Sequence, residues 1–570
     1  MRALGRAAPA ETTFVENNPT IGEYLIARLH EGGVRHVFGI PGDYVLGFYD
    51  LLVHSPLAVI TTCDEQGAGF AADGYARVRG LGAVCVTYGV GGLKIVNPVA
   101  GAFAEMSPVV VISGAPGVRE RASNPLLHHK VRDFETQKKV FEQITVASAV
   151  LDDPLTAFAE IDRVLAAARR WNRPVYLELP RDMVDVRGVP GHRPAAFEEP
   201  GDPQALEEAL GEAIAMLNAA QRPVILADVE IHRFHQQKQA LRLIEATGIP
   251  FASTLMGKSV LSERHPLYLG LYAGAMGGDA AREAVEGSDA LLMLGAFMTD
   301  INLGIYTARL DPSRIISTTG ERVAIRYHRF ENVRMEAFLE GLLRPGALRR
   351  HEIQLPAREP IPDFEIEPRA PLTVARLFQR LNEFLNDDTI VICDIGDALF
   401  GAADLRIHRR TEFLGPAYYA SMGFAVPVAL GVELSNPALR PLVVVGDGAF
   451  QMTGVELSTA VRQGLNPIVL VMNNCGYGTE RNLKEGPYND ILEWHYTELP
   501  RLLGAGRAWD VHTEGDLDRA LEEAAANVGS FSLLDLHLDK MDRSPALARL
   551  ASRLARRLDG AQEQEPASVA

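Results

Sequence analysis

Short apolar runs alternate with segments of helical periodicity along most of the chain. Between residues 20 and 180, TIGEYLIARLHEGG and EQGAGFAADGYARVRG have the spacing of helices, whereas LAVITTCD, GAVCVTYG and SPVVVISG have the pattern of buried strands. This alternation is typical of parallel sheets that are covered by helices on both faces. We therefore predict an α/β fold made of doubly wound parallel sheets.

Two polar stretches rich in proline or glycine divide the pattern into three parts. DVRGVPGHRPAAFEEPGDP precedes the helical pattern PQALEEALGEAIAMLNAA, and LRPGALRRHEIQLPAREPIPDFEIEPRAPLT precedes the third part; both have the composition of linkers. The expected organisation is a disordered tail (1–19), three α/β domains (20–185, 203–345 and 370–545), and a C-terminal helix and tail (546–570). We expect that helix to pack on the last domain.

The stretch from Pro441 to Glu480 predicts one βαβ unit. An apolar run ends at GDG, a helical segment runs from Thr453 to Gln463, and a second strand ends at NNCG. Because ligands in such units bind beyond the carboxyl ends of the strands, we expect Asp447 and Asn474 to lie close together. A carboxylate and an amide oxygen are ligands that suit Mg²⁺.

Composition and charge narrow the class of protein. The 570 residues are 47% hydrophobic and 23% charged, as in ordinary globular proteins. A formal charge of −17 argues against nucleic acid or an anionic membrane as a partner, because both are negatively charged and bind surfaces with clustered Lys and Arg. No apolar run has the length of a membrane span, MRALGRAAPAETTF lacks the apolar core of a secretory signal, and the four cysteines have no CxxC spacing. We expect a cytoplasmic protein whose main partner is neither nucleic acid nor a membrane.

The spacing of GDG and NN resembles the motif of thiamine diphosphate (ThDP)-dependent enzymes. Three α/β domains with this motif in the third are similar to those of the ThDP-dependent 2-oxo acid decarboxylases. The resemblance implies a pyrimidine-binding first domain, a central spacer and a diphosphate-binding third domain. It further implies that Asp447, Asn474 and the carbonyl of Gly476 hold Mg²⁺, and that the cofactor also contacts Gly446, Gly448 and Ala449.

Glu65 lies between an apolar run and a helix rich in small residues. From the residues alone, an acidic side chain that complements the helix dipole is the favoured interpretation. The resemblance, carried by E-x-x-x-x-x-x-A-x-G-Y-A-R, implies instead that Glu65 reaches N1′ of the cofactor's pyrimidine ring across a subunit interface and promotes formation of the ylid. Met422, in YYASMGFAVP, matches the apolar residue that props the cofactor into its bent shape.

Three further signals are weak singly. Without the resemblance, His128 and His129 in NPLLHHKVRDFE would be interpreted as part of a polar loop. Asp43 in FGIPGDY would be a turn residue, and Glu480 would be a charge in contact with solvent. The resemblance implies that the histidines and Asp43 form a proton relay and that Glu480 lies near the departing carboxylate.

Two positions depart from relatives that are specialised for pyruvate. Leu399 replaces a large aromatic residue and Thr479 replaces a bulky aliphatic one, which implies a larger substrate pocket.

The expected activity is non-oxidative decarboxylation of a bulky 2-oxo acid, such as indolepyruvate or phenylpyruvate, by a homodimer or a dimer of dimers. The alternatives are a carboligase of the acetolactate synthase type, a pyruvate decarboxylase proper, and a ThDP-binding subunit without turnover.

Overall fold

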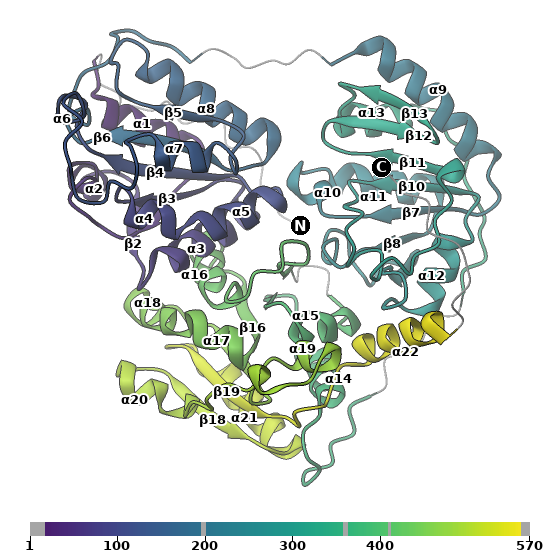
Figure 1. Cartoon of the computed structure of the whole chain (residues 1–570). Helices are drawn as coiled ribbons and strands as arrows, with labels where there is room; N and C mark the ends of the chain where they lie inside the picture. Colours follow the sequence, from purple (N-terminus) through teal and green to yellow (C-terminus); the bar gives the residue numbers. More distant parts are fainter. Residues whose placement is uncertain (1–17, 195–200, 357–362, 408–411, 560–570) are drawn as a thin grey trace. The chain divides into compact units, whose positions relative to one another are not determined.

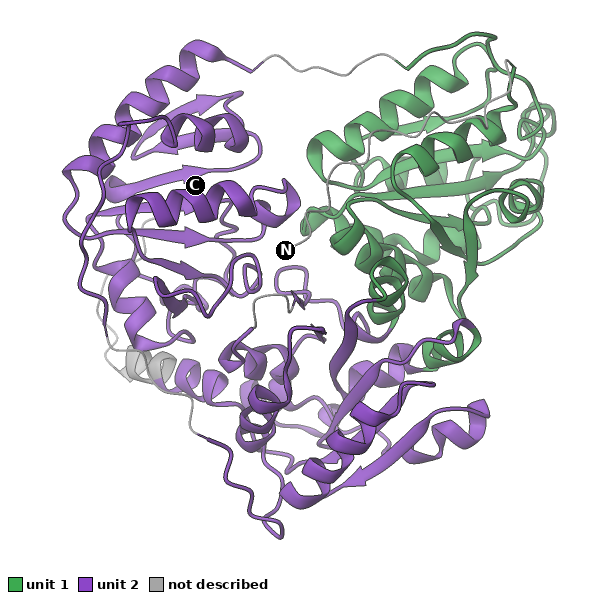
Figure 2. Ribbon diagram, turned by 180° about the vertical axis from the view of Figure 1, so that it is seen from behind, with its two compact units in different colours: residues 1–198, 427–437, 455–462 green, residues 199–426, 438–454, 463–570 purple. Residues whose placement is uncertain are grey.

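The computed structural model describes residues 18–194, 201–356, 363–407 and 412–559, with side chains up to residue 552 (Figure 1). The chain forms two compact units (Figure 2). One comprises residues 1–198, 427–437 and 455–462, and the other comprises residues 199–426, 438–454 and 463–570. Of the predicted N-terminal tail (1–19) and C-terminal helix and tail (546–570), residues 1–17 and 560–570 lie outside the described residues.

The first sheet is wholly parallel and has the strand order β2-β1-β3-β4-β6-β5. Helices α1, α2 and α8 pack on one face, and α3 contacts the sheet and α5. Its strands are β1 (His36–Gly39), β2 (Ala58–Thr61), β3 (Gly82–Val86), β4 (Val109–Ala115), β5 (Ser148–Val150) and β6 (Val175–Pro180). Its helices are α1 (Ile21–Glu31), α2 (Leu46–Val53), α3 (Glu65–Arg79), α4 (Val90–Lys94), α5 (Val96–Ala104), α6 (Val118–Arg121), α7 (Thr136–Phe141) and α8 (Ala157–Trp171).

Helix α3 is fixed at both ends by local signals and along its length by close packing. The side chain of Asp64 caps the first turn, and Gly80 ends the helix in the left-handed conformation. Helix α16 (Ala425–Ser435) lies so close to α3 that a Cβ on Gly431 would be 1.9 Å from the carbonyl oxygen of Ala71. The small residues of both helices therefore allow them to meet backbone to backbone.

The second sheet has the order β13-β12-β11-β10-β7-β8-β9, with β11, β12 and β13 antiparallel and the other pairs parallel. Helices α9, α11 and α13 cover one face and α12 the other. The strands are β7 (Pro223–Ala227), β8 (Phe251–Ser253), β9 (Tyr268–Leu271), β10 (Ala290–Leu294), β11 (Ile315–Thr318), β12 (Arg322–Ile325) and β13 (His328–Glu331). The helices are α9 (Pro203–Ala219), α10 (Glu230–Arg233), α11 (Gln237–Thr247), α12 (Asp279–Glu286), α13 (Met335–Leu342) and the 3₁₀ turn η1 (Pro312–Arg314).

The third sheet is parallel, in the order β15-β14-β16-β17-β19-β18. Its strands are β14 (Thr389–Cys393), β15 (Glu412–Leu414), β16 (Arg440–Gly446), β17 (Ile468–Asn473), β18 (Arg507–Val511) and β19 (Ser532–His537). Around it are α14 (Val374–Phe384), α15 (Asp397–Gly401), η2 (Ala402–Asp404), α17 (Asp447–Thr453), α19 (Gly478–Leu483), η4 (Pro487–Asn489), η5 (Tyr496–Glu498), α20 (Leu499–Leu503), α21 (Glu514–Ala526) and α22 (Pro545–Asp559). Between α17 and β17, η3 (Gly454–Glu456) and α18 (Leu457–Gln463) lie almost entirely in residues 455–462, which belong to the first unit.

The helical pattern after GDG differs from its prediction. The sequence predicts one helix from Thr453 to Gln463, whereas α17 begins at Asp447 itself and α18 follows a 3₁₀ turn. Glycine has a low helix propensity, so the presence of Gly448 argued against a helix that begins at Asp447. Burial of Ala449 and Phe450 stabilises the helix there.

A buried ion pair joins the second sheet to the third within the larger unit. Lys258 donates from Nζ to Oε1 of Glu263 at 2.9 Å and to the carbonyl oxygen of Leu405 at 2.8 Å. The other oxygen of Glu263 accepts from the amide of Ile407 at 2.8 Å. Both ionic side chains are almost completely buried. These contacts hold Leu405 and Ile407, which follow α15, against the central part of the chain.

The C-terminal helix α22 packs against α15, beside the third sheet. Ala546, Leu547 and Leu550 enter the hydrophobic core, and Arg549 forms an ion pair with Asp404. Among the described residues, no helix has both the length and the apolar character required to cross a membrane.

Candidate active site

The third sheet reverses its winding direction between β14 and β16. The chain leaves β14 towards β15 and leaves β16 towards β17, on opposite sides. Ligands bind at such a switch point, outside the carboxyl ends of the strands. Gly446 is the last residue of β16, and Asp447 and Asn474 directly follow β16 and β17. The predicted diphosphate and metal residues therefore lie at the position where this fold binds ligands.

Asp447 is a buried carboxylate surrounded by backbone amides. Its Oδ1 accepts from the amide of Gly448 at 2.7 Å, and its Oδ2 accepts from the amide of Gly476 at 3.0 Å. Burial raises the pKa of Asp447 to about 6, against the opposing effect of these amides. Each oxygen keeps a lone pair, and a cation bound there would favour the ionised carboxylate.

The loop after β17 has a conformation that only its sequence permits. Gly476 has a φ of +152°, and a Cβ at this position would lie 2.0 Å from the carbonyl oxygen of Asn489. The half-buried Asn474 lies against Gly478, where a Cβ would be 2.5 Å from the Asn474 amide nitrogen. Because carboxylate, amide and carbonyl oxygens gather on this loop and at Asp447, the residues fit Mg²⁺.

Arg481 fixes the far side of this loop. Its guanidinium is buried and donates to the carbonyl oxygens of Cys475 at 3.2 Å and Asn489 at 3.4 Å. It also pairs with Asp490 at 2.7 Å and with Glu485 at 2.8 Å. The sequence offered no signal for this role, because an Arg in a polar stretch after a strand resembles an exposed charge.

Met422 occupies a turn that is held by a second buried carboxylate. Asp394, directly after β14, accepts from the amides of Gly423 at 3.2 Å and Ala425 at 2.9 Å. Thr453, at the end of α17, donates to the carbonyl oxygen of Gly423 at 2.8 Å. Burial raises the pKa of Asp394 to about 6. This residue was not predicted, although an Asp directly after the apolar run TIVIC was an available signal.

The three predicted substrate-side residues have different environments. Glu480 is exposed on α19, and Thr479 is half-buried, with its hydroxyl 3.2 Å from the position of a Cβ on Gly396. Thr479 therefore lies beside the β14 end of the switch point. Leu399, in α15, is completely buried and belongs to the core of the third sheet.

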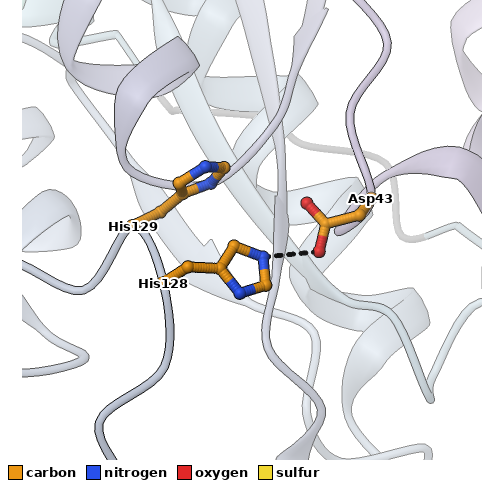
Figure 3. A group of neighbouring side chains, drawn as sticks. All are labelled: Asp43, His128 and His129. Carbon is orange, nitrogen blue, oxygen red and sulfur yellow. Dashed lines mark hydrogen bonds and ion pairs between the residues drawn. The ribbon is translucent and has the colours of Figure 1, made fainter.

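The first sheet has its own switch point, between β1 and β3, and three predicted residues gather near it (Figure 3). Nε2 of His128 lies 2.7 Å from Oδ2 of Asp43, and the rings of His128 and His129 meet edge to face at 4.7 Å. The pair is partly exposed, with 57% of the His128 side chain and 42% of the Asp43 side chain accessible. The structure thus brings together the three residues that the resemblance groups, and their role as a relay stays a prediction.

Surrounding groups orient the histidines. Tyr44 stacks on His128 with ring centroids 4.8 Å apart, and the guanidinium of Arg181 lies 5.1 Å from the centre of the Tyr44 ring and 3.9 Å from Asp43. Nδ1 of His129 is buried and has no hydrogen-bond partner within the described part of the chain. This nitrogen is available to a ligand.

Glu65 is the first residue of α3 and is largely buried, with Lys94 3.5 Å from its carboxylate. Glu456 fixes the turn that presents it: its carboxylate accepts from the amides of Cys63 and Asp64, each at 3.1 Å. Glu456 itself is 1% exposed and accepts a third bond from Thr459. The sequence offered no indication that this residue of GVELST supports the start of α3.

Three family models match the chain in order. The N-terminal TPP binding domain of thiamine pyrophosphate enzymes matches residues 19–143, the central domain matches residues 210–344, and the C-terminal TPP binding domain matches residues 394–536. The chain therefore has the three domains of a thiamine pyrophosphate enzyme, in the same order.

Curated relatives narrow this class. The chain is 38% identical to the indole-3-pyruvate decarboxylase of Azospirillum brasilense, over 93% of this chain and 97% of the relative. It is 37% identical to an alpha-keto-acid decarboxylase of Mycolicibacterium paratuberculosis (95% and 98% covered) and 36% identical to one of Mycobacterium tuberculosis (94% and 97% covered). The chain belongs to the family of ThDP-dependent 2-oxo acid decarboxylases.

Proposed function

We propose that the protein converts a bulky 2-oxo acid, such as indolepyruvate or phenylpyruvate, into an aldehyde and CO₂. The observation that carries this proposal is the 2.7 Å contact between His128 and Asp43 beside His129 at the first switch point. A decarboxylase must return a proton to the carbon that loses CO₂, and a carboxylate-bound imidazole suits that step near neutral pH. A carboligase instead joins that carbon to a second 2-oxo acid and has no comparable need for the relay.

Each residue has an assigned part in this proposal. Asp447, Asn474 and the carbonyl of Gly476 would hold Mg²⁺, and Gly446, Gly448 and Ala449 would contact the diphosphate. Met422 shapes the cofactor site. Bound ThDP supplies the electron sink for the electrons released with CO₂. Glu65 accepts a hydrogen bond from the cofactor's pyrimidine ring, and Glu480 lies near the substrate carboxylate.

The substrate test compares products as well as rates. Protein loaded with ThDP and Mg²⁺ receives phenylpyruvate, indolepyruvate and pyruvate, and free aldehyde and 2-hydroxyketone are quantified separately. Aldehyde as the main product, with a higher kcat/KM for the aromatic acids, supports the proposal. Formation of 2-hydroxyketone alone, or no consumption of any 2-oxo acid, overturns it.

The size of the pocket is tested at Thr479, because this half-buried side chain tolerates change better than the fully buried Leu399. Thr479→Ile adds bulk beside Gly396, and we expect kcat/KM for phenylpyruvate to fall about tenfold more than that for pyruvate. Thr156→Ile makes the same change at an exposed threonine before α8 and should alter neither value. Equal losses for both substrates in Thr479→Ile would contradict the assignment.

We also propose that each active site combines Glu65 of one protomer with Asp447 of another, in a homodimer or a dimer of dimers. The test mixes two inactive variants, Glu65→Gln and Asp447→Asn, by co-expression. If the residues act across chains, hybrid dimers contain one intact site, and about a quarter of wild-type activity returns. If they act within one chain, none returns.

The four described free cysteines are consistent with a cytoplasmic location, which we propose as well.

A further inference from the structure

A second group of histidines and carboxylates lies at the edge of the third sheet. Asp510 in β18 pairs in register with Asp535 in β19, His537 ends β19, and His512 directly follows β18. Nε2 of His537 is 2.6 Å from Oδ1 of Asp510, and Nε2 of His512 is 3.1 Å from Oδ2. One ligand atom from each of Asp510, His512 and His537 lies within 4.8 Å of the others.

Two more carboxylates complete the surroundings of His537. Oδ2 of Asp535 is 3.6 Å from the same Nε2, and its side chain is only 6% exposed. Asn473 donates to the other oxygen of Asp535 at 3.0 Å and so fixes its orientation. Oε1 of Glu493 lies 3.7 Å from Nδ1 of His537, on the opposite side of the ring.

This arrangement has the features of a transition-metal site. Two imidazole nitrogens and a carboxylate are ligands that zinc prefers, and a ligating histidine usually turns its other nitrogen to a carboxylate, as His537 does to Glu493. Three carboxylates close together repel one another, and a divalent cation would offset this repulsion. The rings of His512 and His537 stack at 4.1 Å, and the His512 side chain is exposed enough to turn its nitrogen towards a shared ion.

We propose that Asp510, His512 and His537 bind one divalent transition-metal ion of the zinc class, with Asp535 as the fourth ligand. This site is distinct from the Mg²⁺ site at Asp447, because its nitrogen ligands select against hard cations. A bound ion joins the ends of β18 and β19 next to Asn473, so its role is to stabilise this edge of the sheet.

The experiment measures binding of Zn²⁺ and Co²⁺ to the full-length protein in the presence of ThDP and excess Mg²⁺. Equilibrium dialysis with elemental analysis gives the number of ions per chain, and the visible spectrum of Co²⁺ reports its coordination geometry. We expect one ion at this site and a Co²⁺ spectrum of low coordination number. His537→Gln should abolish binding at this site, and Glu493→Gln should weaken it about tenfold because it leaves the ligands intact.

Matched controls separate this site from other histidines. His54→Gln removes an exposed histidine beside a single carboxylate, Asp50, and should leave binding unchanged. The group at Asp43, His128 and His129 has a similar composition, so His128→Gln is measured as well. No binding of either ion overturns the proposal, as does an ion that is lost in His128→Gln but kept in His537→Gln.

Discussion

Replacing Arg481 by Met should loosen the loop that carries Gly476 without removing any proposed metal ligand. The buried guanidinium donates to two backbone carbonyls, and charge-assisted bonds of this kind contribute about 1.5–3 kcal/mol each. The distances of 3.2 and 3.4 Å favour the low end of that range. The carboxylates of Asp490 and Glu485 are half exposed, so water screens their ion pairs and they add little. The two backbone bonds together give about 3 kcal/mol, or roughly a 100-fold change in an equilibrium constant.

The assay is the apparent Kd for ThDP at fixed Mg²⁺, measured by calorimetry. We expect Arg481→Met to bind the cofactor about 100-fold more weakly, because binding must then order the loop. Arg481→Lys keeps the charge but loses the planar fork and should be intermediate. Arg501→Met removes an arginine that is 84% exposed and paired with Glu498, and serves as the control. If Arg481→Met kept its fold by circular dichroism and bound ThDP within about threefold of wild type, the loop-ordering role would be refuted.

Three other changes test the site and the core. Glu65→Gln should abolish turnover while the thermal unfolding temperature stays unchanged, and near-normal activity would remove Glu65 from the mechanism. Glu456→Ala leaves two backbone amides before α3 without their acceptor, so we expect kcat to fall about tenfold and Glu456→Gln, which keeps one carbonyl oxygen, to restore most of it. Burial raises the pKa of Glu178 to about 7, so the folded state keeps a proton that the unfolded state releases, and stability falls as pH rises from about 4 to 7. Glu178→Gln should therefore raise the free energy of unfolding by up to about 3 kcal/mol relative to wild type at pH 8, and by much less at pH 4; an equal difference at both pH values would contradict this assignment.

Periodicity in the sequence was sufficient to predict the α/β class, because buried parallel strands and amphipathic helices leave strong local patterns. The helix after Asp202, for example, was predicted at its observed start, where Pro203 occupies the first turn. The antiparallel strands β12 and β13 were not predicted, since β13 is mostly exposed and its HRFE sequence has no apolar alternation. The domain limits and the roles of the site residues remain predictions.

Residues that act at a distance in the sequence were beyond local reasoning. Asp43 and His128 were grouped only through a family resemblance, and the structure brings them into contact. Asp394 and Glu456 had no comparable motif, although both are buried carboxylates that accept from backbone amides. Their partners lie far along the chain, so only the folded structure identifies which amides they bind, although the place of Asp394 directly after a strand was an available signal.

The buried pair of Lys258 and Glu263 has a consequence for any attempt to divide this chain. The central part is bounded by linker-like stretches, yet its buried lysine donates to the backbone carbonyls of Ala403 and Leu405, which lie beyond the second linker. Excising or exchanging the central part as a cassette would leave Glu263 beside that lysine but remove these carbonyl acceptors, at a cost of about 1.5–3 kcal/mol for each bond lost. Chimeras within this family should therefore carry residues 403–407 together with the central part, even though these residues are distant from it in the sequence.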